Sequence, residues 1–357
     1  MGFEFAFVHT SFKWRNLASH NAGVTVAIIG IGNQTPKMRR IYSDSDSGET
    51  IIKETDNINP YLASGPNIFV TASPKPLSNS NEMSFGNMAN DGGFLLMDSE
   101  EALRAVATHL VDSKFIRPIL GSQEFIRGQE RRCIWVSDSD SGEANNNKWL
   151  NARFETVKSI RSSSTRQTTR ELADVPHRFG EVRQYGTEKI IIVPRVSSET
   201  REYLPVGYLP SGSIISDSAF ALYDAPIWNM SLIASRLHLV WIATVCGKLK
   251  TDFRYSNTLG WNTFPIPVLT EQNKVDLTTC AEAILLAREA HFPASIADLY
   301  EPEKMPENLR IAHERNDEVI ERIYIGRRFK NDTERLEKLF ELYTKMTVIT
   351  SSKKGKK

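Results

Sequence analysis

Residues 247–257 read GKLKTDFRYSN and residues 261–265 read WNTFP, and this part of the chain decides how the rest is interpreted. As one extended strand, its two-residue period separates charged side chains from packing side chains. The charged face holds Lys250, Asp252 and Arg254. The packing face holds Thr251, Phe253 and Tyr255. The stretch therefore predicts a row of ionic groups on an apolar support.

Such a row suits the reading of a DNA base pair. A lysine donates to guanine O6 or N7, and an aspartate accepts from N4 of the paired cytosine. Lys250 and Asp252 together therefore indicate a G·C pair. The same row also fits the charged solvent face of an edge strand.

Length and composition set the other bounds. With 357 residues, 40% of them apolar, the chain is expected to hold two or three domains with substantial cores. Lys and Arg number 44 against 43 acidic residues, so net charge does not reveal a nucleic-acid partner. Residues 152–170 contain five basic side chains, one acid and many hydroxyls. That local mixture is typical of phosphate contacts.

The cysteines indicate a reducing compartment. Cys133, Cys246 and Cys280 are widely spaced, without a CxxC pair or a histidine at ligand spacing. We expect buried thiols in a cytoplasmic protein, and no metal site. No apolar run reaches the length of a membrane span, and no signal peptide is evident.

Six further stretches accompany the opening one in order along the chain. They are FVHTSFKW (7–14), NAGVTV (21–26), MSFGNM (83–88), GSQEFI (121–126), PHRF (176–179) and VPRVSSETREY (193–203). With these motifs the chain resembles the C-terminal part of a class I, S-adenosyl-L-methionine-dependent adenine-N6 DNA methyltransferase of the MmeI-like (type IIL restriction-modification) family. Together these motifs are specific for the family, whereas no single one of them would be.

The resemblance implies a mixed α+β fold with three parts and a tail. Residues 1–35 are expected to be a methyltransferase remnant built as a β-hairpin, 36–267 an α/β target-recognition domain, 268–350 a helical bundle, and 351–357 a disordered tail. Strands are expected at 67–72, 132–136, 189–193 and 213–216, and residues 34–60 read as polar and largely irregular. Helices are expected at 100–112, 148–161, 226–246, 271–291, 307–324 and 332–347. Asn331 and Glu334 form a capping-box pattern before the last helix.

The resemblance also assigns roles to residues. Bases are read from the segment of Lys250, Asp252 and Arg254, with a partner position near Ser218, and Arg254 reaches another guanine or a phosphate. We also expect contacts to DNA phosphates from Arg127, Arg131, Arg132, Arg161 and Arg166. A second polar cluster, which also fits a solvated hairpin, holds Arg195, Ser197, Ser198 and Arg201. Phe12 and Trp14 are expected near the pocket of the flipped adenine, or they pack the sheet edge.

Catalytic motifs of this class are not recognised in the sequence. Gly30-Ile31-Gly32 leads into NQTP rather than into a helix, so it is a weak candidate for a cofactor turn. Asn59-Pro60-Tyr61 lacks one proline of the (Asn/Asp)-Pro-Pro-(Tyr/Phe) motif. In the resembled family both motifs lie upstream. We expect that this chain alone neither binds S-adenosyl-L-methionine nor methylates DNA, and that a separate N-terminal methyltransferase part, with or without a nuclease domain, completes the enzyme.

No catalytic residue is therefore assigned. His177 and His238 read as structural hydrogen-bonding groups. The first hypothesis is the specificity part of a methyltransferase that acts on double-stranded DNA. The alternatives are a stand-alone module that binds DNA or a methyltransferase without sequence preference, and a small-molecule enzyme with an unrecognised pocket.

Overall fold

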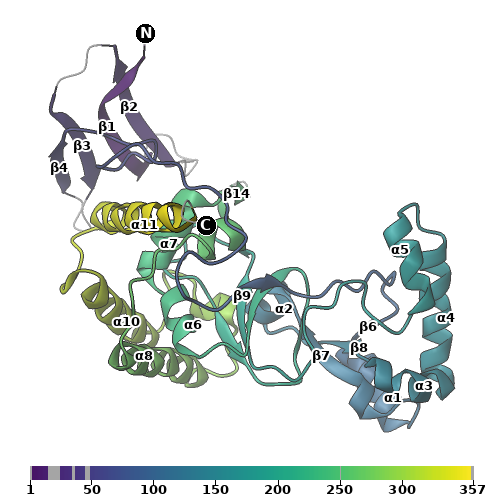
Figure 1. The fold of residues 1–357 in the computed structure, drawn as a ribbon. Coiled ribbons are helices and arrows are strands. Elements are labelled where there is room, and N and C mark those ends of the chain that lie inside the picture. Colours follow the sequence, from purple (N-terminus) through teal and green to yellow (C-terminus); the bar gives the residue numbers. More distant parts are fainter. Residues whose placement is uncertain (1, 15–24, 34–36, 45–48, 250, 355–357) are drawn as a thin grey trace.

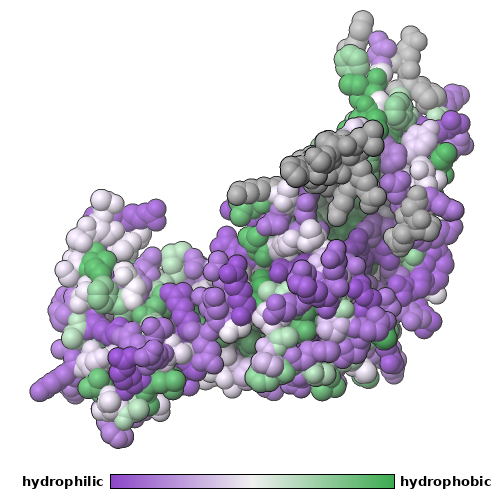
Figure 2. All heavy atoms as spheres, turned by 180° about the vertical axis from the view of Figure 1, so that it is seen from behind, coloured by the Kyte–Doolittle hydropathy of each residue, from purple (hydrophilic) through white to green (hydrophobic). Residues whose placement is uncertain are grey.

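The computed structural model describes residues 2–14, 25–33, 37–44, 49–249 and 251–354. It confirms a mixed α+β fold with several small sheets. Figure 1 shows a central body with one β-sheet at its N-terminal end and a lobe of strands and helices at the opposite end. The surface between the two ends is concave in outline (Figures 1 and 2).

The sheet at the N-terminal end has the strand order β2-β1-β3-β4. Its strands are β1 (Glu4–Lys13), β2 (Thr25–Gly32), β3 (Arg39–Asp44) and β4 (Thr50–Thr55). The β1–β2 pair is antiparallel, as the sequence predicts, whereas β3 and β4 lie in a segment that the sequence predicts to be irregular apart from a strand-like run at residues 40–42. Among the described residues, Val8, Ile41 and Ile58 form a small core on one face of this sheet.

Apolar side chains remain uncovered on this sheet. On its edge strand β2, Ile28, Ile29 and Ile31 are 47%, 45% and 64% exposed. Hydrophobic residues gather over the same sheet in Figure 2. An open edge that carries large aliphatic side chains favours a further protein segment packed against it.

The central body is built on the sheet β11-β9-β13-β5. Its elements are β5 (Ser84–Phe85), β9 (Ile190–Pro194), β11 (Gly207–Leu209), β13 (Ala219–Tyr223), α6 (Trp228–Ile233) and α7 (Arg236–Val245). The helix expected at 226–246 is interrupted because Ser235 caps α7, accepting a hydrogen bond from the His238 amide at 3.1 Å. Residues 67–72 form no strand. Val70 donates its amide to the Tyr61 hydroxyl instead.

The lobe contains the sheet β12-β7-β8-β6, surrounded by short helices. Its strands are β6 (Leu96–Asp98), β7 (Ile116–Leu120), β8 (Arg131–Ile134) and β12 (Ile214–Ile215). Its helices are α1 (Ser99–Ala107), α2 (Ser122–Arg127), α3 (Ser141–Asn146), α4 (Lys148–Ser162) and α5 (Gln167–Glu171), with 3-10 turns η1 (Ser113–Phe115), η2 (Asp138–Asp140) and η3 (Leu172–Asp174). The lobe has its own core, in which Phe154 packs among aliphatic residues of the strands.

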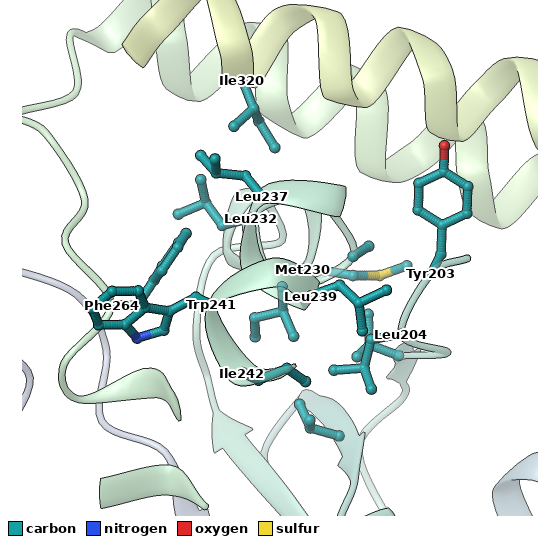
Figure 3. Packing of buried hydrophobic residues seen from close by; sticks show 14 of the residues in the cluster. Tyr203, Leu204, Met230, Leu232, Leu237, Leu239, Trp241, Ile242, Phe264 and Ile320 are labelled. Atoms are coloured by element: carbon teal, nitrogen blue, oxygen red, sulfur yellow. The ribbon is translucent and has the colours of Figure 1, made fainter. Parts of the chain in front are cut away.

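The C-terminal helices are α8 (Glu271–Glu289), α9 (Ile296–Leu299), α10 (Glu307–Ile325) and α11 (Asp332–Lys354). Asn331 accepts the Glu334 amide at 2.9 Å, so the predicted cap is present, although Glu334 accepts from the Lys330 amide rather than from Asn331. These helices share one hydrophobic core with the body. Figure 3 shows Ile320 of α10 beside Leu237 of α7 within that core.

A buried carboxyl group lies where α7 meets α10. Asp317 of α10 is 4% exposed and accepts the Arg236 amide at 2.8 Å. Burial raises the pKa of Asp317 from 3.8 to about 7, the hydrogen bond from Arg236 opposes the rise, and Glu321 adds to it. The folded protein therefore holds this proton between about pH 4 and 7, where the unfolded chain has lost it.

Asp317→Asn should remove this pH dependence. The protonated carboxyl stabilises the wild type below about pH 4, and that contribution is lost as pH rises to 7. The free energy of unfolding of the wild type, relative to Asp317→Asn, should therefore fall between pH 4 and 7, by about 1.4 kcal/mol per unit of pKa shift at most. Urea unfolding of both proteins across this range measures the difference. A difference that does not change with pH would contradict the assignment.

Candidate nucleic-acid interface

The stretch that opens the sequence argument folds as a hairpin rather than as one strand. Strands β10 (Val196–Ser197), β14 (Lys248–Leu249) and β15 (Asp252–Arg254) form a sheet of order β10-β15-β14. Leu249 pairs with Asp252 in antiparallel register, so the chain reverses between them. The prediction of a continuous strand was wrong because this reversal lacks the Asn-Gly or Gly-containing signal of a tight hairpin.

The hairpin sheet has two different faces. Ser197, Phe253 and Lys248 lie opposite one another across its three strands and share one face. Asp252 and Arg254 belong to the other face of β15, where Asp252 is half-buried and Arg254 is exposed. The structure therefore keeps these two predicted base-reading residues together. Lys250, the third, lies outside the described residues.

The residues that follow β15 fix the hairpin to the body. Tyr255 is buried, and its amide donates to the Arg195 carbonyl at 2.9 Å. Its hydroxyl lies 2.8 Å from Nε2 of His238. Burial lowers the pKa of His238 to about 3, so this imidazole is neutral at physiological pH and serves as a hydrogen-bonding support. The prediction that Thr251 also packs inward was wrong, since it is exposed.

The WNTFP segment completes this support. The π-helical turn η4 (Asn257–Trp261) brings Trp261 into the core, where its indole N–H donates to the Asn81 carbonyl at 2.7 Å. Phe264 is fully buried beside it, 4.5 Å from the His238 ring. The hairpin thus stands on a rigid aromatic base, which is the support that a precisely placed recognition residue requires.

Ser218 lies in a small polar network. Its hydroxyl accepts the Ser122 amide at 3.2 Å and lies 2.9 Å from the Ser216 hydroxyl. A side chain at Gly121 would bring a Cβ within 2.0 Å of the Ser218 hydroxyl, which explains the glycine. The side chain of Ser218 is exposed.

Arg195 connects this network to the hairpin. Its guanidinium donates to the Asp217 carbonyl at 2.8 Å and lies over the Phe85 ring at 5.0 Å. Its own amide donates to the Ser122 hydroxyl at 3.1 Å. Since Arg195 directly precedes β10, it holds the loop that carries Ser218 against the hairpin sheet. The structure thereby brings Ser218, Arg195 and the hairpin together, and a phosphate contact of Arg195 stays a prediction.

Arg161 does not bind phosphate. Its side chain is fully buried, and its guanidinium donates to backbone carbonyls around the end of α4: Ala89, Asn90, Leu172, Val175 and Arg178. Burial lowers its pKa, and Asp91 nearby partly offsets this shift. The prediction was wrong because all of its donors are used to join α4 to neighbouring loops.

The other predicted phosphate ligands have different surroundings. Arg166, at the start of α5 on the tip of the lobe, and Arg127 are exposed, and neither forms an ion pair with any residue that the structure describes. Arg131 and Arg132 are paired with Glu124 at 3.4 Å and Glu130 at 3.7 Å. Ser198 is half-buried and shares a hydrogen bond with Thr200. Ser197 is only 3% exposed and accepts from Arg201, so its predicted direct phosphate contact is contradicted by its burial.

The aromatic pair lies at the end of β1. The rings of Phe12 and Trp14 are 6.3 Å apart, and Trp14 is 48% exposed. Phe12 also contacts the His9 ring at 4.7 Å. An exposed indole here is compatible with stacking on a base, and its role in the vicinity of a flipped adenine stays a prediction.

The Asn59-Pro60-Tyr61 segment forms a turn. The Asn59 side chain is fully buried, and its Oδ1 accepts the amides of Tyr61 and Ala63 at 2.9 and 3.2 Å. Tyr61 stacks on Phe340 at 4.9 Å. The Asn59 amide oxygen therefore caps a turn, and the Tyr61 ring packs against α11.

Comparison with known proteins identifies the family. The sequence profile described as "MmeI, target recognition domain" matches residues 64–268, more than half of the chain. The chain belongs to the MmeI family. Profiles for the MmeI C-terminal domain and the MmeI DNA-methyltransferase domain match residues 269–350 and 1–43. The resemblance read from the sequence is therefore confirmed.

Two relatives place the chain within the MmeI family. It is 38% identical to DNA methyltransferase A of Bacillus subtilis (strain 168) over 346 residues, which cover 97% of this chain and 39% of that protein. It is 32% identical to the type IIL restriction-modification enzyme MmeI, solved in complex with DNA, with a TM-score of 0.79 over 97% of this chain and 46% of that one. The chain thus spans less than half the length of either relative.

Two kinds of feature are absent from the part of this MmeI-family chain that the structure describes. Among the described residues, no helix is both long and apolar enough to cross a bilayer. In the same part of the chain, no three His, Cys, Asp or Glu side chains come together in a way that would hold a metal ion.

Sequence reasoning missed one feature of this MmeI-family chain. A cleft of about 470 Å³ lies where the N-terminal sheet, the hairpin and α11 meet, and Arg236 and Lys248 are among the residues that line it. Its lining comes from separate segments between Thr10 and Leu336. No local motif could have revealed it, because only the tertiary fold brings these segments together.

Proposed function

We propose that this chain is the sequence-recognition portion of a site-specific adenine-N6 DNA methyltransferase of a restriction-modification system. The observation that carries the proposal is the supported hairpin, whose outer face presents Asp252 and Arg254 and which Arg195 connects to the loop of Ser218. Carboxylate and guanidinium groups held on a rigid strand are suited to reading base edges in the major groove. Membership of the MmeI family supports double-stranded DNA as the ligand.

Phosphate contacts supply the remaining affinity in this proposal. Helix α5, which Arg166 precedes, and strand β14 of the hairpin lie on either side of the concave outline in Figure 1. Arg127, Arg131, Arg132, Arg195, Ser198 and Arg201 remain candidates for the same role. Groups spread along one concave face can follow a DNA backbone and fix its register.

Methyl transfer belongs to a separate N-terminal methyltransferase part, which binds S-adenosyl-L-methionine as the methyl donor. The uncovered isoleucines of β2 support such a partner, because they offer an edge strand and an apolar face to a larger sheet. The same exposed face also favours the second candidate, a stand-alone module that docks on a methyltransferase without reading sequence.

Binding to randomised duplexes separates the two candidates. At one fixed salt concentration, the recognition portion should select one short asymmetric site and bind it at least about a thousandfold more tightly than random DNA. Its affinity for that site should fall steeply as salt rises, since phosphate contacts release counterions. Fluorescence anisotropy after several rounds of selection measures both quantities. A chain with equal affinity for all duplexes would instead be the non-specific module.

A further inference from the structure

The cleft between the N-terminal sheet, the hairpin and α11 is lined by more basic than acidic side chains. Lys248 is paired with Glu199 at 3.3 Å, and Arg236 is paired with Asp332 at 2.5 Å. Arg201 also lines the cleft but has no carboxylate within ion-pair distance among the described residues. Three basic residues, Arg201, Arg236 and Lys248, and two acidic ones, Glu199 and Asp332, line the cleft, so its described lining has a net positive charge.

The guanidinium of Arg201 has unused donors. It is half-buried, and the hydrogen bond that it gives to the Ser197 hydroxyl is long, at 3.4 Å. Burial lowers its pKa, while the charge of Asp252 and the Tyr300 hydroxyl raise it. An arginine stays protonated in such surroundings, and most of its five N–H donors are left for a ligand.

The rest of the cleft suits an anion that also carries an apolar surface. Leu239, Val240 and Phe253 form an apolar wall, and Thr10 and Thr333 add hydroxyl groups from β1 and α11. A guanidinium with neighbouring hydroxyls is a typical partner of a phosphate group, and an apolar wall accommodates the adjoining deoxyribose. One phosphodiester carries one negative charge, which complements the net positive charge of the described lining.

The position of the cleft connects it to the recognition hairpin. Phe253 and Lys248 lie on the cleft side of the hairpin sheet, while Asp252 and Arg254 belong to the opposite face. The cleft also reaches Thr10 and Ser11 of β1, next to the Phe12 and Trp14 pair. A DNA strand bound in this cleft would contact the methyltransferase remnant, the recognition domain and α11 at the same time.

We infer that this cleft binds one phosphodiester of the recognised DNA, with Arg201 as its ionic partner. This contact sets the position of the base pair that is read relative to the N-terminal sheet, against which the separate methyltransferase part is proposed to pack. The inference rests on the proposed function, because it requires DNA as the ligand. Beyond that function, the inference specifies one phosphate-binding site and one residue, Arg201, whose substitution should change the salt dependence of DNA binding by a predictable amount.

The test compares Arg201→Gln with wild type on the selected duplex. Loss of one phosphate contact should reduce the slope of log affinity against log salt by about 0.9. Arg201→Lys keeps the positive charge, so its salt slope should stay close to that of wild type. Its affinity should be lower, because an ammonium group cannot donate two parallel hydrogen bonds as a guanidinium does. Arg322→Gln, which removes an exposed charge on α10, is the matched control and should leave the slope unchanged.

Neutral methylphosphonate linkages, placed one at a time along both strands, locate the contact. At one position the substitution should weaken wild type and leave Arg201→Gln unaffected. If wild type selects its site but Arg201→Gln retains the full salt slope and the wild-type methylphosphonate pattern, the cleft assignment is overturned and the recognition function stands. If the chain shows no sequence preference at all, both are overturned.

Discussion

Asp252→Ala is expected to weaken binding to the preferred duplex by about 10- to 100-fold and to relax selection at one base pair. A well-placed contact to a base edge discriminates by about 1–3 kcal/mol, which corresponds to that range. The effect should be confined to one position of the site, because a phosphate contact would weaken all sequences equally. Affinities for the four duplexes that differ at that position, measured at one salt concentration, give the result.

A charge swap makes this test stricter. Lys250→Glu together with Asp252→Arg should change which base pair is preferred at that position, as expected if the two side chains read the two bases of one pair. Thr251→Ala is the control within the same turn, since Thr251 is exposed and has no assigned role. An unchanged site preference in the swapped protein would show that the hairpin does not read sequence.

Arg161→Met should destabilise the lobe by about 3–5 kcal/mol, the range for breaking a buried, fully paired charged group. The substitution leaves the carbonyls of Asn90 and Arg178, among others, without their guanidinium donor. Urea unfolding followed by tryptophan fluorescence reports the loss, because Trp135 and Trp149 lie in the lobe.

Arg166→Met is the natural comparison. Its side chain is exposed, so the free energy of unfolding should change by less than about 0.5 kcal/mol. In the proposed role it should instead lower DNA affinity and the salt slope. Equal stability of the two variants would contradict the structural role assigned to Arg161.

Sequence patterns located the parts of this fold that have a strong period. The lobe helix α4 and the fully buried strand β9 fall close to their predicted ranges. Arg161 shows how a pattern can be misjudged. Its position continues the buried helical face of Leu150, Phe154 and Val157, so the spacing itself contained the signal of burial. The cluster of basic residues around Arg161 predicts exposure, whereas the helical period predicts burial, and the period is correct.

The hairpin shows a different limit. Its apolar support was predictable, since Tyr255, Trp261 and Phe264 are all buried. Its reversal was not, because a reversal without glycine or asparagine depends on the pairing of β15 with its neighbouring strands rather than on local preference. The cleft around Arg201 was beyond sequence reasoning for the same cause: its walls are far apart along the chain.

The two faces of the hairpin differ in how freely they can change during evolution. Phe253 and Tyr255 hold the strand in place, whereas Arg254 is exposed and Asp252 is only half-buried. Substitutions on that outer face cost little folding free energy, typically within about 0.5 kcal/mol. In the proposed role of the hairpin, target preference can therefore change one residue at a time while every intermediate remains folded.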